Sequence, residues 1–234
     1  MTGVQTCALP IFLEARVDSA PCEPNAPHAD SENLCGRDVC VVRGIPRGGF
    51  VTSIRVIAGK YGGRKLDAPK SNNTRTKPMG ERIRNALFNR IGGEVRGAHV
   101  LDAFAGTGAV GFEALSRGAA HVTFIERDKI AQNILRKNMV SLGVESDVTL
   151  VCSSVSVWLE SGQTENYDII FADPPYHDTQ FSTVSKLLSL LKPGALMVLS
   201  HPGRGEFPNL TKEIVVVDNR SYGNAFLTSF RRER

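Results

Sequence analysis

The sequence lacks any apolar run long enough to cross a bilayer. A transmembrane helix needs about 18 or more predominantly apolar residues in succession, and no stretch of this chain reaches that length. The segment from Leu9 to Leu13 is too short for the apolar region of a signal peptide, and no basic segment precedes it. These absences argue against a membrane or exported protein, and we expect a soluble, cytoplasmic one.

Cysteine is nearly absent beyond the first 40 residues. Four of the five cysteines lie in that segment: Cys7, Cys22, Cys35 and Cys40. Their spacings include no C-x-x-C pair, so a zinc site completed by His28 is only weakly supported, and we expect no metal. The remaining cysteine, Cys152, is expected to be a buried apolar thiol. This usage fits a reducing compartment.

Periodicity is missing from the first 52 residues. Pro21, Pro24 and Pro27 interrupt a stretch of polar and small residues, which is typical of a disordered segment. The opening letters MTGVQTCALPI also resemble the translation of a sequencing-library adapter. We therefore expect residues 1–52 to be a disordered or artefactual leader, with Val51 as a candidate natural start. The folded part then comprises a basic segment at 53–96 and a larger domain at 97–234.

Positive charge is concentrated in the basic segment. The chain has a net charge of +4, and residues 55–96 carry eleven Lys or Arg against three acids. A basic surface suits a polyanion such as RNA, although a solvated, solubilising face explains the charge equally well. After a strand or hairpin at 54–66, Pro78 precedes a helix with an apolar stripe of Ile83, Leu87, Phe88 and Ile91. On the RNA interpretation, Lys77 and Arg82 contact phosphate.

The residues from Val100 to Glu126 read as strand, glycine turn, helix and strand. Gly106, Gly108 and Gly111 form G-x-G-x-x-G, which lets a backbone turn sharply and approach a ligand closely. Glu126 follows the second strand, 20 residues after Gly106, where an acid can accept hydrogen bonds from ribose hydroxyls. This arrangement predicts a site for a nucleoside cofactor, with an ordinary tight turn as the alternative.

The glycine pattern does not by itself distinguish between cofactors. Dinucleotide-binding folds have the same glycines and the same distal acid. Asp102 lies at the end of the first strand, four residues before Gly106, where its carboxylate suits a cationic cofactor better than a pyrophosphate. The chain also carries Asp173-Pro174-Pro175-Tyr176, for which a hydride-transfer enzyme has no evident use. Both features favour a cationic cofactor over NAD.

The segment Asp173-Pro174-Pro175-Tyr176, here called the second motif, directly follows the apolar stretch YDIIFA at 167–172. That stretch is typical of a strand buried on both faces. It should therefore lie at the carboxyl end of a sheet, where open α/β folds bind ligands. Asp173 and the carbonyl of Pro174 can each accept an N–H of an exocyclic amine and so direct its lone pair at a methyl group. Tyr176 can stack on the base. A simple strand-ending turn is the alternative.

Strand and helix patterns alternate along the domain. Strands are expected at 100–101, 121–125, 148–151, 167–172, 195–200, 213–217 and 225–230. Helices are expected after the glycine turn and at 129–142, 155–159 and 181–191, the last closed by Pro193-Gly194. This order predicts a Rossmann-like α/β fold, with a mostly parallel, seven-stranded sheet and helices on both faces.

Together these motifs resemble a known family. Asp102-Ala-Phe-Ala-Gly-Thr-Gly combined with the second motif is similar to class I S-adenosylmethionine-dependent methyltransferases that act on amino groups of bases. Three further segments resemble the N-terminal signature of the bacterial 16S ribosomal RNA guanine-N2 methyltransferases: Arg55-Val-Ile-Ala-Gly, Gly63-Arg-Lys-Leu, and Lys77-Pro through Glu81-Arg-Ile-Arg-Asn-Ala-Leu-Phe-Asn. The resemblance spans about residues 54–232. Because DNA adenine and cytosine methyltransferases share the second motif, the N-terminal signature carries the narrower assignment.

The resemblance implies a role for each motif residue. Around the methionine part of S-adenosyl-L-methionine it places Asp102, Phe104, Gly106 and Gly108. It places Glu126 on the ribose, Ser154 near the adenine, and Asp173, Pro174 and Tyr176 around the target guanine. The chain departs from the family pattern at Ser154, where Asp or Asn is usual, and at Lys77-Pro78-Met79, where Arg-Pro-Thr is usual.

We therefore predict a monomeric enzyme that uses S-adenosyl-L-methionine to methylate the N2 amine of a guanine in 16S ribosomal RNA, free or in the assembling small subunit. A DNA adenine or cytosine amino-methyltransferase is the nearest alternative, but it normally needs a target-recognition segment that this short chain lacks. An RNA-binding assembly factor without turnover is the alternative from another class. An NAD-dependent oxidoreductase is a distant third.

Overall fold

The computed structural model describes residues 52–69, 79–163, 165–203, 208, 210–223 and 225–234. The predicted leader except Thr52, its cysteines and Lys77 lie outside these residues. Within the described residues, no helix combines the length and the hydropathy that crossing a bilayer requires.

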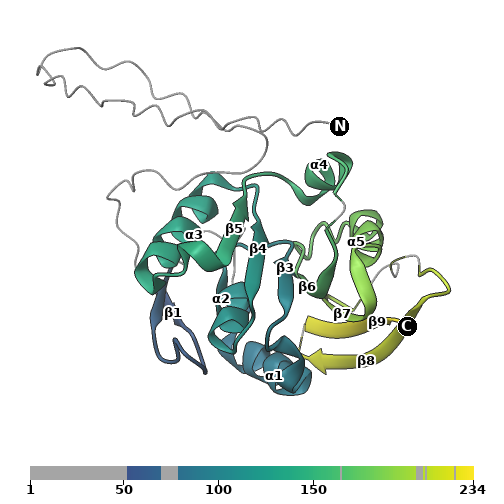
Figure 1. The fold of residues 1–234 in the computed structure, drawn as a ribbon, viewed down its shortest axis with the longest axis horizontal. Coiled ribbons are helices and arrows are strands. Elements are labelled where there is room, and N and C mark those ends of the chain that lie inside the picture. The colour runs from purple at the N-terminus through teal and green to yellow at the C-terminus, as the bar shows by residue number, and fades with distance from the viewer. Residues whose placement is uncertain (1–51, 70–78, 164, 204–207, 209, 224) are drawn as a thin grey trace, which may run out of the picture. The chain divides into compact units, whose positions relative to one another are not determined.

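The central feature is a seven-stranded sheet with the order β5-β4-β3-β6-β7-β9-β8 (Figure 1). In that order the strands are Val148–Val151, His121–Ile125, His99–Asp102, Tyr167–Ala172, Leu191–His201, Ala225–Arg232 and Ile214–Tyr222. The pairs from β5 to β7 are parallel, and β9 pairs antiparallel with both β7 and β8. The predicted mostly parallel, seven-stranded α/β fold is therefore confirmed.

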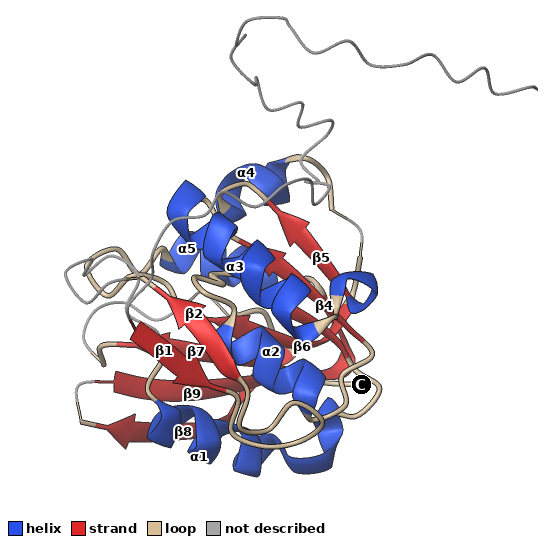
Figure 2. Cartoon of the chain, turned by 90° about the vertical axis from the view of Figure 1, so that its left-hand side faces the viewer, coloured by secondary structure: helices blue, strands red, loops and turns tan. Residues whose placement is uncertain are grey.

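Alternate residues of the central strands enter two separate cores, because successive side chains of a strand point to opposite faces. One face, with Val100 and Phe171, packs against helices α1 (Glu81–Ile91), α2 (Ala109–Ser116) and α3 (Lys129–Leu142). The other face, with Leu101 and Ile170, packs against α4 (Val155–Glu160) and α5 (Phe181–Leu188). Figure 2 shows α2 and α3 in front of the sheet. Helices thus cover both faces, as expected for buried parallel strands.

The basic segment begins with a separate two-stranded antiparallel sheet, β1 (Thr52–Arg55) and β2 (Lys65–Ala68). This confirms the predicted hairpin, although β1 begins and ends earlier than the alternating residues suggested. The Asn138 side chain on α3 bonds to both the backbone N–H and the carbonyl of Asp67, at 2.7 and 3.1 Å. The hairpin is therefore fastened to the helical layer rather than to the central sheet. Two short 3₁₀ helices complete the elements, at Gly92–Val95 and Glu145–Asp147.

The predicted end of α5 at 191, closed by Pro193-Gly194, is wrong. The helix ends at Leu188, and β7 already begins at Leu191 and continues through the Pro-Gly pair. The register of β6 with β7 shifts between Tyr167 and Ile169. Such an irregularity can accommodate a proline, which has no N–H to donate to the sheet. Strand pairing therefore overrides a dipeptide that usually signals a turn.

Candidate functional site

A cleft of about 940 Å³ opens at the carboxyl ends of β3, β4, β6 and β7. Its lining includes eight of the residues that the sequence placed at a cofactor or base site: Asp102, Phe104, Gly106, Glu126, Ser154, Asp173, Pro174 and Tyr176. They come together because parallel strands end at the same edge of the sheet. The two motifs, about 70 residues apart, thus share one cavity.

The glycine turn shapes the floor of this cleft through two close contacts. Gly108 begins α2 with a left-handed φ of 80°, and a Cβ on it would lie 2.5 Å from Phe112 Cε2. At Gly111 a Cβ would lie 2.2 Å from Phe124 Cε1, so helix and sheet approach too closely for a side chain. Gly106 lines the cleft, whereas Gly108 does not. Gly108 acts on the cleft by setting the direction of the turn.

Asp102 is the most enclosed acid of the cleft, with 3% of its surface exposed. Its Oδ2 accepts the backbone N–H of Gly111 at 3.0 Å. Burial is the main reason that the pKa of Asp102 is raised to about 7; the Gly111 hydrogen bond opposes the shift, and the nearby Asp173 and Glu126 add to it. A cationic ligand would relieve this cost, because it favours the ionised carboxylate.

Glu126 is held by two backbone groups of the surrounding turns. Its Oε2 accepts the N–H of Gly106 and its Oε1 that of Asp128, both at 2.7 Å. Burial raises the pKa of Glu126, and backbone hydrogen bonds from Asp128, Gly106 and Arg127 oppose the shift. A carboxylate has about four lone pairs, so Glu126 keeps the capacity to accept a ribose hydroxyl beside these backbone bonds. The described residues thus offer anchored acceptors beside a close backbone turn, which fits a cationic nucleoside such as S-adenosylmethionine.

The second motif forms a polar pair with a residue that the sequence did not single out. Tyr176 is 42% exposed, and its hydroxyl lies 2.9 Å from Oγ of Ser200, which lines the cleft at the carboxyl end of β7. Burial raises the pKa of Asp173, and a hydrogen bond with Ser200 opposes the shift. Ser200 therefore joins the acid and the aromatic ring. Its place at the carboxyl end of a predicted strand was the signal that could have identified it.

The other predicted contacts have different surroundings. Ser154 begins α4, and its Oγ accepts the N–H of Val157 at 3.3 Å. Arg82 is exposed and does not line the cleft. Cys152 is only half-buried, contrary to expectation, and Arg136 Nη2 lies 3.0 Å from its sulfur. The described residues contain no group of three or more His, Cys, Asp or Glu able to hold a metal ion.

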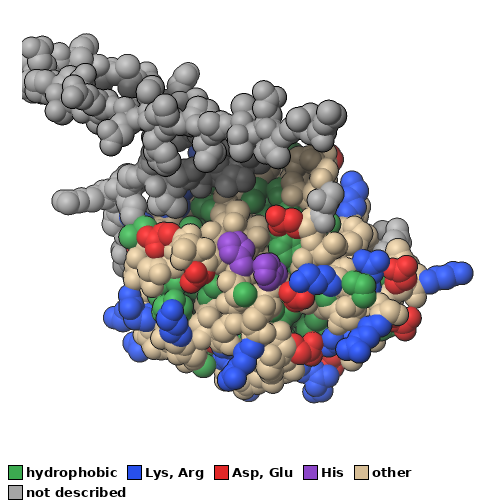
Figure 3. All heavy atoms as spheres, viewed as in Figure 1, with side chains coloured by type: hydrophobic (Ala, Val, Ile, Leu, Met, Phe, Trp, Pro, Cys, Tyr) green, Lys and Arg blue, Asp and Glu red, His purple; other side chains and the backbone are tan. Residues whose placement is uncertain are grey.

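The basic segment and the last hairpin also contribute to the cleft. Met79, which precedes α1, and Ile83 of α1 line it, as do Tyr222 at the end of β8 and Ala225 at the start of β9. Figure 3 shows that Lys and Arg side chains lie around the lower and right-hand edges of the visible face, mixed with Asp and Glu. The cleft therefore lies between elements from both ends of the folded chain.

The fold and this site together define a class I methyltransferase of the Rossmann-like type. Comparison with known proteins narrows the assignment. The family model described as "Conserved hypothetical protein 95" matches residues 54–231, so the chain belongs to that family.

Several relatives have more informative names. Ribosomal RNA small subunit methyltransferase D of Haemophilus influenzae is 40% identical over 152 residues, which cover 62% of this chain and 76% of the relative. The Escherichia coli protein of the same name is 40% identical over 123 residues, covering 53% and 60%. The solved structure of the Escherichia coli yhhF protein has a TM-score of 0.69 at 30% identity, covering 78% of this chain and 99% of that one.

Proposed function

We propose that this protein transfers a methyl group from S-adenosylmethionine to the N2 amine of a guanine in 16S ribosomal RNA. The observation that carries the proposal is the shared cleft, in which Asp173 of the second motif faces the same cavity as Asp102 and Glu126. The names of the relatives support small-subunit ribosomal RNA as the substrate. The choice of guanine N2 as the methylated atom rests on the resemblance of the N-terminal signature.

On this proposal the cofactor is held by residues at the carboxyl ends of β3 and β4 and at the start of α4. Glu126 accepts the ribose hydroxyls, and Phe104 and the Gly106 turn enclose the methionine part. Ser154 lies at the adenine end, where its hydroxyl is already near Ser156 Oγ at 3.2 Å. When bound, S-adenosylmethionine supplies a methyl group on a positively charged sulfur, and the ionised Asp102 stabilises that charge through space.

The base is positioned by the second motif. Asp173 and the Pro174 carbonyl accept the two N–H bonds of the amine and aim its lone pair at the methyl carbon. The N–C bond forms as the S–C bond breaks, the sulfur keeps the bonding electrons, and the amine then loses one proton to Asp173 or to water. Because burial raises the pKa of Asp173, this carboxylate accepts a proton more readily than an exposed one does. Tyr176 presents its ring for stacking on the base.

The RNA itself is held through its backbone. Arg82 is exposed at the start of α1, and Lys77 precedes it in the chain. We assign both to phosphate contacts, which would give binding a strong dependence on salt. Met79 and Ile83 line the cleft and lie within three residues of Arg82 in the sequence. An RNA strand whose phosphate binds Arg82 can therefore place a neighbouring nucleotide in the cleft.

A methyl-transfer assay on defined substrates tests the proposal. The protein is incubated with labelled S-adenosylmethionine and 16S ribosomal RNA, free or in small subunits, from a strain that lacks the modification; duplex DNA is the control. Digestion and mass spectrometry should yield N2-methylguanosine at one position. Transfer to adenine or cytosine of DNA would overturn the proposal in favour of a DNA enzyme. Tight RNA and cofactor binding without transfer would favour an assembly factor.

A further inference from the structure

A fully buried arginine joins the basic segment to the methyltransferase domain. Arg84 on α1 is 0% exposed, although a charged guanidinium is expensive to remove from water. Its Nη1 donates to the Met79 carbonyl at 3.0 Å, and its Nη2 donates to the Arg55 carbonyl at 2.5 Å. One side chain therefore holds both the end of β1 and Met79, two residues before α1.

The partner acid lies on α2 and is just as buried. Glu113 Oε2 is 3.8 Å from Arg84 Nε and accepts the Ile57 N–H at 2.7 Å. Its Oε1 accepts the Ala58 N–H at 3.2 Å and pairs with Arg117 Nε at 2.7 Å. Arg84 and Glu113, the buried pair, thus tie residues 55–58, Met79 and α2 into one polar network.

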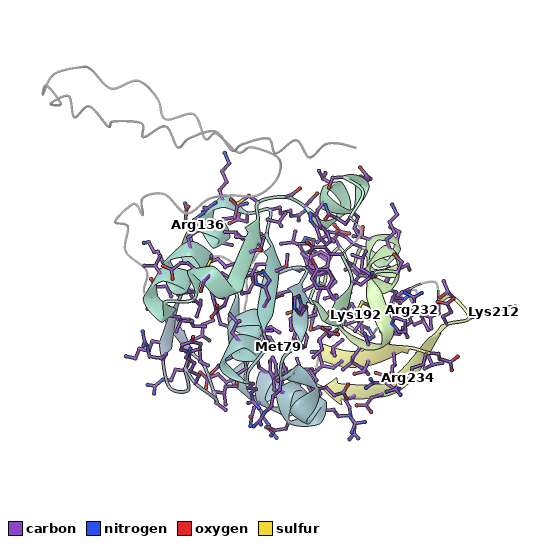
Figure 4. All side chains as sticks on the ribbon, in the orientation of Figure 1. Met79, Arg136, Lys192, Lys212, Arg232 and Arg234 are labelled. Carbon is purple, nitrogen blue, oxygen red and sulfur yellow. The ribbon has the colours of Figure 1, made fainter. Side chains whose placement is uncertain are left out.

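Both ends of this network reach the cleft. α2 begins at the glycine turn, and its Gly111 N–H is bonded to Asp102. Met79, whose carbonyl Arg84 holds, lines the same cavity as Asp173. Figure 4 shows Met79 beside α1, well away from the basic side chains Arg232 and Arg234. The buried pair is therefore the connection between the cofactor turn and the wall formed by α1.

Stability alone gives little reason to keep such a pair. Removing two charges from water costs free energy that their attraction often fails to repay, and apolar replacements of similar volume are frequently neutral or stabilising. Arg84 Nε also has no hydrogen-bond partner among the described residues. The directional bonds to backbone carbonyls and amides are what an apolar pair would not supply.

We propose that Arg84 and Glu113 are positioning residues, which hold Met79 and residues 55–58 in register with the glycine turn so that a target nucleotide is presented correctly to the methyl donor. The inference rests on the proposed function for the identity of the substrate. The inference adds that a buried ion pair, which does not itself contact the cofactor, sets the position of the residues that line the substrate part of the cleft.

Three variants and a control test this inference. Arg84→Met fills the volume without the bonds, Glu113→Gln keeps the shape without the charge, and Met79→Ala alters the wall alone. Asn89→Ala, at an exposed position of the same helix, is the control. For each we would measure the single-turnover methylation rate at saturating RNA, the RNA and cofactor dissociation constants, the melting temperature and the amide hydrogen exchange.

Arg84→Met should lower the transfer rate about 10- to 100-fold, since misplacement by about 1 Å can have that effect. Its cofactor dissociation constant should stay within about threefold of wild type. Faster hydrogen exchange should be confined to residues 55–58 and the start of α1, and Arg84→Lys should recover part of the rate. Glu113→Gln should have the same effects in weaker form, Met79→Ala should weaken RNA binding, and the control should match wild type.

Two results would overturn the inference. One is an unchanged rate and unchanged exchange in Arg84→Met and Glu113→Gln. The other is a parallel loss of rate, cofactor affinity and melting temperature in those variants, with Met79→Ala inert, which would make the pair a general structural contact. If the wild-type protein transferred no methyl group, the proposed function would fail instead, and the exchange and RNA affinity of the variants would still decide about positioning.

Discussion

Three carboxyl groups meet in the cleft: Asp102, Glu126 and Asp173. Burial raises the pKa of all three. The protein therefore holds acids that resist ionisation in the absence of a ligand. That property suits a site for a positively charged cofactor and gives the folded protein a characteristic dependence on pH.

The raised pKa of Asp102 should make the ligand-free protein less stable as the pH rises. An unfolded aspartate has a pKa of about 3.9, and the folded value is about 7. Between these values the folded state binds more protons, so the free energy of unfolding falls with rising pH by up to about 1.4 kcal/mol per unit, and levels off above the folded pKa. Asp102→Asn keeps an oxygen for the Gly111 N–H and should remove this contribution.

Urea unfolding of both proteins at pH 5, 6.5 and 8 measures the effect. Since Glu126 and Asp173 contribute in the same direction, the difference between Asp102→Asn and wild type isolates Asp102. The free energy of unfolding of Asp102→Asn should increase relative to that of wild type as the pH rises. Parallel pH profiles would show that Asp102 is ionised across the range.

Asp173 and Tyr176 should separate catalysis from binding. Asp173→Ala removes an acceptor that is needed most during transfer, so turnover should fall about 10²- to 10⁴-fold with little change in cofactor affinity. Tyr176→Phe loses the bond to Ser200 but keeps the ring and should stay near wild type, whereas Tyr176→Ala should lose about 1–3 kcal/mol of stacking. Single-turnover rates and melting temperatures measure both. A folded, fully active Asp173→Ala protein would remove its proposed role.

At the scale of elements, α2 lies against the sheet at a distance that only glycine permits. A Cβ on Gly111 would meet Phe124 Cε1 at 2.2 Å and Val122 Cγ1 at 2.9 Å. We expect Gly111→Ala to destabilise the fold by about 1–3 kcal/mol through overpacking. It should also weaken cofactor binding, because the Gly111 N–H holds Asp102. Gly93→Ala, where a Cβ meets nothing within 4 Å, is the control, and equal chemical denaturation of both variants would contradict this packing argument.

The start of α1 should control the salt dependence of RNA binding. Replacing Lys77 and Arg82 with Ala should weaken binding and flatten the plot of log affinity against log salt by up to about one unit per lost contact. Cofactor affinity should not change. Arg90→Ala removes a cation of the same helix that is paired with Asp218 at 2.7 Å, and should leave the slope intact. An unaltered slope in the variant that lacks Lys77 and Arg82 would indicate that these side chains are solvated and do not contact RNA.

For the whole molecule, ligand binding should be coupled to global stability. A cofactor that binds only the folded state stabilises it by about 2.7 kcal/mol at 100 times its dissociation constant. Glu126→Ala should lose the ribose hydrogen bonds, worth about 1.5–3 kcal/mol for a charged acceptor, and with them much of the thermal shift. Calorimetry and melting curves with S-adenosylmethionine, and with NAD as control, measure this. Unchanged affinity in the variant would contradict the assignment of Glu126.

The sequence by itself determined the sheet, its seven strands and the position of the cleft. Apolar strands, the glycine turn and the motif at Asp173 are local signals, and the meeting of parallel strands at one edge brings them together whatever the side-chain details. Glu126 and Asp102 could be assigned to one site for that reason. The chemical roles of Asp102 and Glu126 stay predictions. So do the phosphate contact of Lys77 and the nature of the leader at 1–52.

Only the tertiary structure decided the surroundings of single side chains. Arg84 has the sequence context of a solvated helix residue, yet it is buried, because its partners at Arg55 and Glu113 lie 29 residues away in both directions. Ser200 contacts Tyr176, 24 residues away in the sequence. The strand β7 continues through a Pro-Gly pair because it is paired with β6 on either side of it. Such contacts depend on which elements pack together, and periodicity along the chain carries no information about that.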